Sequence, residues 1–237
     1  LPFTEFLFMK YCDIPSALFE KNRQNLVAAL PETAIAVVHA AEVPWRSADG
    51  STRFIQNSDL FYLTGVDQEE TVLVLCPGHS DPKMREILFV RETSELTAIW
   101  EGHKLTKEEA TAVSGISTVF WTDDFEPILR RLTRSFEMIF LSHNEHGRSA
   151  APVNYYREDR FRLWCQDRYP HHRYERLAPL LHRLRVEKSE PEIELIQKAC
   201  EITSDGFSRV LRFVKPGVKE YEIEAELDYR FRRSGGL

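Results

Sequence analysis

The sequence predicts an α/β fold, a mixed sheet covered by helices on both faces, because short apolar runs alternate with helical patterns. Residues 33–40, 71–76 and 86–90 are such runs, and each has the length and continuous apolar character of a strand in the middle of a sheet. Segments with the spacing of amphipathic helices lie between and after further runs of this kind. The alternation indicates the fold class, whereas strand order does not follow from it.

The first elements can be placed along the chain. A helix is expected at residues 15–30, where apolar residues recur at helical spacing and Pro31 ends the pattern. The run at residues 33–40 supplies the first strand. The strands at residues 71–76 and 86–90 are joined by a polar turn, so we expect them to form a β-hairpin.

The middle of the chain continues the alternation. Residues 106–113 predict a short helix with a threonine cap and two glutamates in its first turn. Residues 117–121 and 136–142 predict two more strands. Residues 123–134 predict a helix between them that an aspartate caps.

Helical patterns then replace the strands. Residues 155–167 and 173–186 predict helices, and we expect no strand beyond residue 152. We therefore expect a first domain at residues 1–175 and the start of a second at residues 176–237.

A long helix is expected to open at Ser189, because Glu192 follows it at capping-box spacing. A second amphipathic helix is expected at residues 220–233. Apolar and small residues recur along the first of these helices and predict one buried stripe. Its members are Ile193, Ile196, Cys200, Thr203, Phe207, Val210 and Val214.

The composition is that of a globular protein with a substantial core. The chain has 237 residues, of which 43% are hydrophobic and 29% are charged, and its net charge is -6 with the basic residues dispersed. This balance disfavours nucleic acid as a partner, and no apolar stretch has the length of a transmembrane helix. Residues 1–12 are apolar but short, and we expect an arm or a first helix there.

The four cysteines lie far apart in the sequence and form no CxxC pair, so we expect buried free thiols in a reducing cytoplasm. The chain also lacks an initial methionine and closes on a broken helical pattern. We therefore expect it to be part of a longer protein.

The densest group of polar and aromatic residues lies in residues 46–65. Ser47, Asp49 and Gly50 predict a turn, after which Ser58 or Asp59 is expected to cap a short helix. Ion pairs of Arg46 and Arg53 with Asp49 and Asp59 are expected to brace the loop, although direct chemistry is the alternative. The structural motif consists of Arg46, Asp49, Arg53, Asn57, Asp59 and Tyr62.

Other groups of chemically active residues are weaker candidates. His143, Glu145 and His146 resemble metal ligands, but they have loop character and lack a further ligand at helical spacing. Asp123 and Asp124 are expected to cap a helix and not to form a catalytic pair. No hydrolase, P-loop or Rossmann motif is present, so the sequence predicts no complete active site and no metal site in this chain.

Trp100 stands in a polar neighbourhood, before Gly102 and His103. Its ring is either packed on its own domain or offered to a partner, and the sequence does not decide between the two.

The stretch RSADGSTRFIQNSDLFYLTGVDQEETVLVL, followed by ILFV and LTAIWEGHKL, resembles the N-terminal domain of the Xaa-Pro aminopeptidases, members of the creatinase and prolidase superfamily. The block LRVEKSEPEIELIQKACEITSDGF, with KPGVKEYEIEAEL, resembles the entry into the "pita-bread" catalytic domain of the same family. The resemblance extends from about residue 16 to the end of the chain. The fold expected from it is a creatinase-like N-terminal domain with the first two helices of an incomplete catalytic domain.

The resemblance implies an enzyme that releases an N-terminal residue preceding proline by means of water activated between two divalent metals, usually manganese. The family's metal ligands lie beyond the matched region, so the chain by itself is expected to be inactive. Homo-oligomers and peptides with proline in second position are the implied partners. Trp100 is carried over as a candidate for the border of the substrate cleft, since the family can lend an aromatic residue from this segment to a neighbouring subunit.

Two alternatives remain at this point. One is a non-catalytic oligomerisation module of the same fold, and the other is a creatinase-like or prolidase-like hydrolase with a different substrate. The RSAD and QNSD signatures argue against the second only by resemblance.

Overall fold

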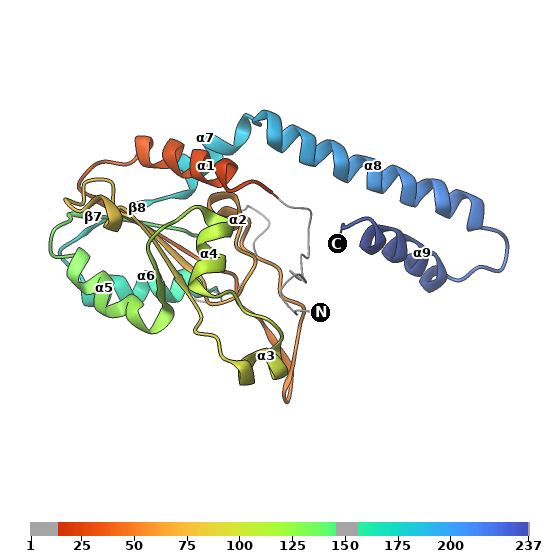
Figure 1. Cartoon of the computed structure of the whole chain (residues 1–237), viewed down its shortest axis with the longest axis horizontal. Helices are drawn as coiled ribbons and strands as arrows, with labels where there is room; N and C mark the ends of the chain where they lie inside the picture. The colour runs from red at the N-terminus through yellow and green to blue at the C-terminus, as the bar shows by residue number, and fades with distance from the viewer. Residues whose placement is uncertain (1–13, 146–155, 237) are drawn as a thin grey trace, which may run out of the picture. The chain divides into compact units, whose positions relative to one another are not determined.

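The computed structural model describes residues 14–145 and 156–236 and divides the chain into two compact units. The larger unit, residues 15–186, is an α/β domain (Figure 1). Its strands are β1 (Ala34–His39), β2 (Trp45–Ser47), β3 (Gly50–Ser51), β4 (Val72–Leu75), β5 (Glu86–Val90), β6 (Val119–Trp121), β7 (Met138–Leu141) and β8 (Arg173–Arg176).

The helices of this unit are mostly short, and two 3₁₀ turns accompany them. Most begin or end near the positions that the sequence predicts. They are α1 (Ser16–Ala29), α2 (Ser58–Thr64), η1 (Pro82–Met84), α3 (Glu95–Glu101), α4 (Lys107–Ser114), η2 (Thr122–Asp124), α5 (Phe125–Leu132), α6 (Arg157–Arg168) and α7 (Ala178–Val186).

Six strands form one mixed sheet in the order β6-β5-β4-β1-β7-β8. The pairs β1–β4 and β4–β5 are antiparallel, and the pairs β1–β7, β5–β6 and β7–β8 are parallel. The predicted hairpin of β4 and β5 is therefore confirmed. A separate two-stranded ribbon, β2–β3, projects from the domain.

Helices cover both faces of the sheet, as the sequence predicts. Along β1, Ala36 and Val38 pack into the core beneath α1, α2, α4 and α7, whereas Ile35 and Val37 pack into the core beneath α5 and α6. Alternate residues of a strand point to opposite faces, so a strand between two helical layers must be apolar at every position. The mixed α/β fold is confirmed.

Strand β8 corrects the prediction that no strand lies beyond residue 152. It occupies Arg173–Arg176, at the start of a segment predicted to be helical, and pairs with β7 at the edge of the sheet. Only Tyr174 among its residues is half-buried, and its hydroxyl donates to the carbonyl oxygens of Cys165 and Tyr169, at 2.7 and 2.8 Å. An edge strand with charged outward residues carries no apolar run, which explains why the pattern missed it.

The first compact unit extends to Val186, beyond the domain boundary predicted after residue 175. Leu177, Ala178 and Leu181, in and before α7, are buried within this unit. The boundary between the two family domains stays a prediction.

Two helix caps differ from the expectation. Asn57, and neither Ser58 nor Asp59, caps α2, since its side-chain oxygen accepts a hydrogen bond from the Asp59 N–H at 2.9 Å. Asp124 holds the N-cap position of α5 without a side-chain cap bond, because the 3₁₀ turn η2 precedes the helix. The capping box of Thr106 and Glu109 at α4 is present.

The second unit begins at Glu187 and contains α8 (Glu190–Phe213) and α9 (Glu220–Arg233). The predicted capping box of Ser189 and Glu192 opens α8. The two helices pack as a hairpin in which ion pairs join Arg209 to Glu226 and Arg230 to Asp205.

The predicted buried stripe of α8 is wrong. Ile193, Ile196, Phe207 and Val214 are between 45% and 58% exposed, and Cys200 is exposed as well. The face that packs instead includes Gly206, where an added Cβ would lie 3.1 and 3.2 Å from atoms of Phe231 and Leu227. In the part of the chain that the structure describes, α8 packs mainly against α9. The apolar stripe of α8 is wider than the surface that one helix can cover, so part of the stripe stays exposed.

Two glycines of the first unit lie at helix ends where an added side chain would meet neighbouring atoms. Gly65 and Gly115 both end helices in the left-handed region, with φ of 69° and 73°. A Cβ on Gly65 would lie 2.3 Å from the ring of Phe19, which is 3% exposed, whereas a Cβ on Gly115 would meet the movable side chain of Glu20.

We expect Gly65→Ala to destabilise the protein more than Gly115→Ala. Both substitutions carry a backbone cost of about 1–2 kcal/mol for a left-handed alanine, and only the first adds about 1–3 kcal/mol of overpacking. Urea unfolding of the two variants measures the difference. Equal loss of stability would show that the Phe19 ring does not constrain this turn.

Candidate functional site

The polar residues of the first unit gather where strands β1 and β7 end. These strands are parallel, so their carboxyl ends lie at the same edge of the sheet, the usual place for a ligand site in α/β domains. A cavity of about 970 Å³ opens there, and we call it the edge cavity. It is lined by residues 41–44, 57–59, 142–145 and 156–158 and by His182 and Arg185.

Each carboxylate that lines the edge cavity has a donor of its own. Arg185 pairs with Asp59, Arg176 with Glu145 and Arg160 with Glu42. The Arg176 hydrogen bond lowers the pKa of Glu145.

The fourth lining carboxylate, Glu158, accepts a hydrogen bond from the Asn57 side chain at 2.9 Å. Burial raises its pKa, and the hydrogen bonds from its own backbone and from Asn57 oppose that rise.

The HNEH segment contributes structural contacts. The Nδ1 atom of His143 lies 2.7 Å from a carboxylate oxygen of the buried Asp159, and Glu145 is held by Arg176. His146 lies outside the described residues. Within residues 14–145 and 156–236, no group of three or more His, Cys, Asp or Glu side chains is arranged to hold a metal ion.

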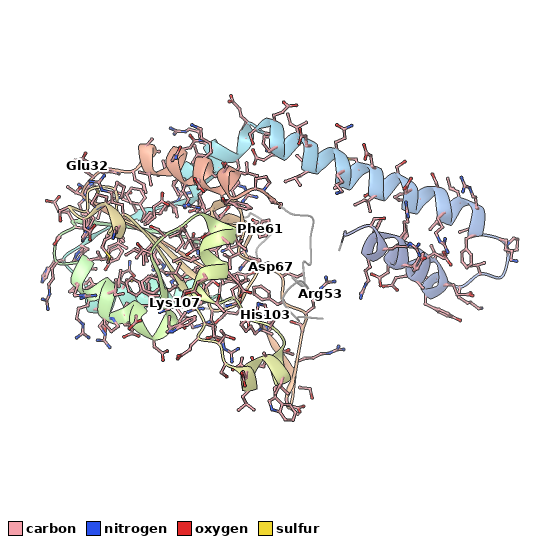
Figure 2. The ribbon with its side chains drawn as sticks, viewed as in Figure 1. Glu32, Arg53, Phe61, Asp67, His103 and Lys107 are labelled. Carbon is pink, nitrogen blue, oxygen red and sulfur yellow. The ribbon has the colours of Figure 1, made fainter. Side chains whose placement is uncertain are left out.

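The predicted braces of the loop do not form among the described residues. Arg46, Asp49 and Arg53 are exposed on and beside the β2–β3 ribbon and make no ion pair there. Figure 2 shows Arg53 at the surface. The residue with positive φ in the turn is Ala48, at 47°, and neither Asp49 nor Gly50. A short exposed ribbon carries its side chains into solvent, which accounts for the difference.

The other three residues of the predicted motif lie against the domain. Asn57 caps α2 and bonds Glu158. Asp59 pairs with Arg185, whose guanidinium also lies 5.5 Å from the centre of the Tyr62 ring. The structure therefore brings Asn57, Asp59 and Tyr62 together beside the edge cavity. The other three residues of the motif lie apart from them, on and beside the exposed ribbon.

Gln56 fixes the loop that the sequence prediction attributed to arginines. Its side-chain oxygen accepts hydrogen bonds from the N–H groups of Ala41 and Asn57, at 3.1 and 2.8 Å. Its amide nitrogen donates to the carbonyl oxygens of Val66 and Gln68, at 3.0 and 2.9 Å. A single glutamine among many polar residues gives no local signal of this role.

Trp100 lies on α3 and is 80% exposed, so its ring is not packed on its own unit. Leu96 and Ile99 on the same helix are also exposed, at 66% and 75%. The helix is anchored at its end, where Arg91 holds Glu101 by two hydrogen bonds of 2.5 and 2.9 Å. An anchored helix thus presents a small apolar surface to solvent.

His39, at the end of β1, was not singled out in the sequence. It is 2% exposed, and its ring contacts Phe125 and Phe161 at centroid distances of 5.7 and 4.3 Å. Among the described residues, neither ring nitrogen has a hydrogen-bond partner. Burial holds the pKa of His39 well below the ordinary 6.5, and the charge of Arg157 lowers it further.

We expect the protein to lose stability as the pH falls below 6.5. A histidine with a lowered folded-state pKa binds its proton more readily after unfolding, so the stability it contributes is present above pH 6.5 and lost below it. For one proton the loss at pH 5 is at most about 2 kcal/mol. Unfolding curves at pH 7 and pH 5 measure it.

His39→Leu should reduce that acid-dependent loss, whereas His171→Leu should leave it unchanged because His171 is exposed. If His39→Leu loses as much stability between pH 7 and pH 5 as the unsubstituted chain, His39 is not the group responsible for the loss.

Comparisons with known proteins identify the family of this chain. The family described as aminopeptidase P, N-terminal domain, matches residues 19–140, more than half of the chain. The chain belongs to this family. Metallopeptidase family M24 matches residues 194–237, so the two matches follow in the order expected from the resemblance.

Relatives match most of this chain but only part of their own length. The Xaa-Pro aminopeptidase of Escherichia coli (strain K12) is 29% identical over 92% of this chain and 49% of the relative. A structure of a putative aminopeptidase P from Bacillus anthracis has a TM-score of 0.83 at 29% identity, covering 94% of this chain and 52% of that one. The Xaa-Pro dipeptidase of Pongo abelii is 25% identical over 94% of this chain and 44% of its own. The chain thus spans about half the length of these relatives.

Proposed function

We propose that this chain is the N-terminal part of a metal-dependent Xaa-Pro aminopeptidase, which releases an N-terminal residue that precedes proline. The observation that carries the proposal is the order of the two family matches, an aminopeptidase P N-terminal domain followed by the start of an M24 peptidase region. The dipeptidase relative is a weaker match than the Escherichia coli aminopeptidase, at 25% against 29% identity.

In this proposal the chemistry comes from residues outside the chain. Two divalent cations, manganese by resemblance, would activate a water molecule and polarise the scissile carbonyl. The described residues do not offer a ligand set for such a pair. This chain instead contributes Trp100 to the border of the substrate cleft and surfaces for assembly.

Homo-oligomers are the proposed state of assembly. The exposed Leu96, Ile99 and Trp100 on the anchored helix α3 supply an apolar surface suited to a second copy of the chain. A cytoplasmic location is proposed because Cys76 and Cys165 are buried free thiols. None of the described helices combines the length and the apolar character that crossing a membrane requires.

The proposal is tested by a peptidase assay of the longer protein that contains this chain. With added manganese it should cleave the first residue from a peptide with proline in second position, and it should leave the same peptide with alanine there uncut. Chelation of the metal should abolish release. A correctly folded protein that cleaves neither peptide would instead support a non-catalytic oligomerisation module of the same fold.

A further inference from the structure

Arg157 differs from the other charged residues that line the edge cavity. It opens helix α6 beside the end of β1, and the residue is half-buried. Among the described residues it forms neither an ion pair nor a hydrogen bond through its side chain. Burial lowers the pKa of this guanidinium.

Two of the carboxylates near Arg157 are already engaged with other groups. Glu42 is paired with Arg160, and Glu158 accepts from Asn57. These two carboxylates, together with Glu70, are close enough to favour the charged form of Arg157 but make no ion pair with it. Among the residues that the structure describes, the Arg157 guanidinium therefore has no partner at the cavity wall.

A guanidinium withdrawn from water is costly unless an acceptor replaces the lost hydration. Its planar set of N–H donors matches two oxygen atoms of a carboxylate. The cavity, at about 970 Å³, has room for a ligand much larger than a single ion. Its wall adds hydroxyl groups at Ser58 and Ser142 that can bond the remainder of such a ligand.

We propose that the edge cavity binds a small molecule that carries a carboxylate, of the size of an amino acid or short peptide, and that Arg157 receives the carboxylate. The site lies wholly within residues 15–186, where no metal cluster is present among the described residues. The inference does not rest on the proposed peptidase activity.

Calorimetric titration of the 237-residue chain tests this site. The probes are the dipeptide Ala-Ala, the same dipeptide with an amidated C-terminus, and inorganic phosphate. We expect Ala-Ala to bind and its amide to bind at least about tenfold more weakly, because a charge-assisted hydrogen bond is lost. Equal binding of the two dipeptides, no binding of Ala-Ala at millimolar concentration, or binding of phosphate alone would overturn the proposal.

Arg157→Gln should weaken Ala-Ala binding by about tenfold or more, whereas Arg162→Gln should not. Arg162 lies on the same helix, bonds Gln166 at 3.1 Å and does not line the cavity. Because Arg157 has no partner within residues 14–145 and 156–236, its substitution should leave the thermal midpoint unchanged or higher. A lowered midpoint with unchanged binding would assign Arg157 a structural role instead. If Arg157→Gln fails to fold, the proposal is tested by comparing the binding of Ala-Ala and of its C-terminal amide to the unsubstituted chain.

Discussion

Arg23→Met is expected to lower the free energy of unfolding by about 3–5 kcal/mol, the cost of breaking a buried charge network. Arg23 is 1% exposed and lies on α1. Its Nε atom donates to a carboxylate oxygen of Glu86 at 2.8 Å. One of its terminal nitrogens donates to the carbonyl oxygens of Leu63 and Ser114, each at 2.8 Å.

The two carbonyl groups explain the size of this effect. Leu63 and Ser114 lie in the last turns of α2 and α4, where carbonyl groups lack partners within the helix. A cation at a helix C-terminus also interacts favourably with the helix dipole. Methionine would leave both carbonyls buried without a donor and Glu86 without its partner.

Lys21→Met is the matched control, because Lys21 lies on the same helix but is exposed. It should change stability by less than about 0.5 kcal/mol. Arg23→Lys should fall between the two variants, since it keeps the charge but cannot reproduce the fork of donors. Urea unfolding measures all three. A loss below about 1 kcal/mol for Arg23→Met would mean that the network does not hold α1, α2 and α4 together.

The second large effect is expected for Trp100→Ala in the longer protein. If Trp100 borders the substrate cleft, loss of its ring should raise KM for an Xaa-Pro peptide by about tenfold or more, corresponding to about 1.5–3 kcal/mol of lost apolar contact. Metal content should stay the same, because the ring is not a ligand. Steady-state kinetics and metal analysis on the same samples test both statements.

Ile55→Ala provides the control for this variant. Ile55 is 76% exposed but does not lie on α3, so its removal should change neither KM nor metal content. Unaltered kinetics in Trp100→Ala would refute the border role. A loss of metal in that variant would show that the substitution acts through the structure of the metal site.

Much of the first unit could be predicted from local patterns. The runs in β1, β4 and β5 are apolar at nearly every position because helices cover both faces of the sheet, and this pattern indicates central strands. The capping box that begins at Ser189 was equally visible, because its two partners lie three residues apart. At Thr106 the sequence predicts the threonine cap, and the structure adds the reciprocal bond of Glu109.

Contacts between distant segments could not be predicted in this way. Arg23 meets Glu86 and Ser114 across 63 and 91 residues, and Asp59 meets Arg185 across 126. Nothing in the sequence around these residues distinguishes the partners they take from other charges. The edge cavity combines residues from several such segments, so its existence follows from the sheet order and not from any motif.

We propose that this chain supplies the border of an aminopeptidase site while the metal chemistry comes from residues outside it. Incubation of the 237-residue chain with manganese and an Xaa-Pro peptide tests it most directly. We expect no release of the N-terminal residue above a blank without protein. Release that exceeds the blank and disappears on chelation would contradict the claim.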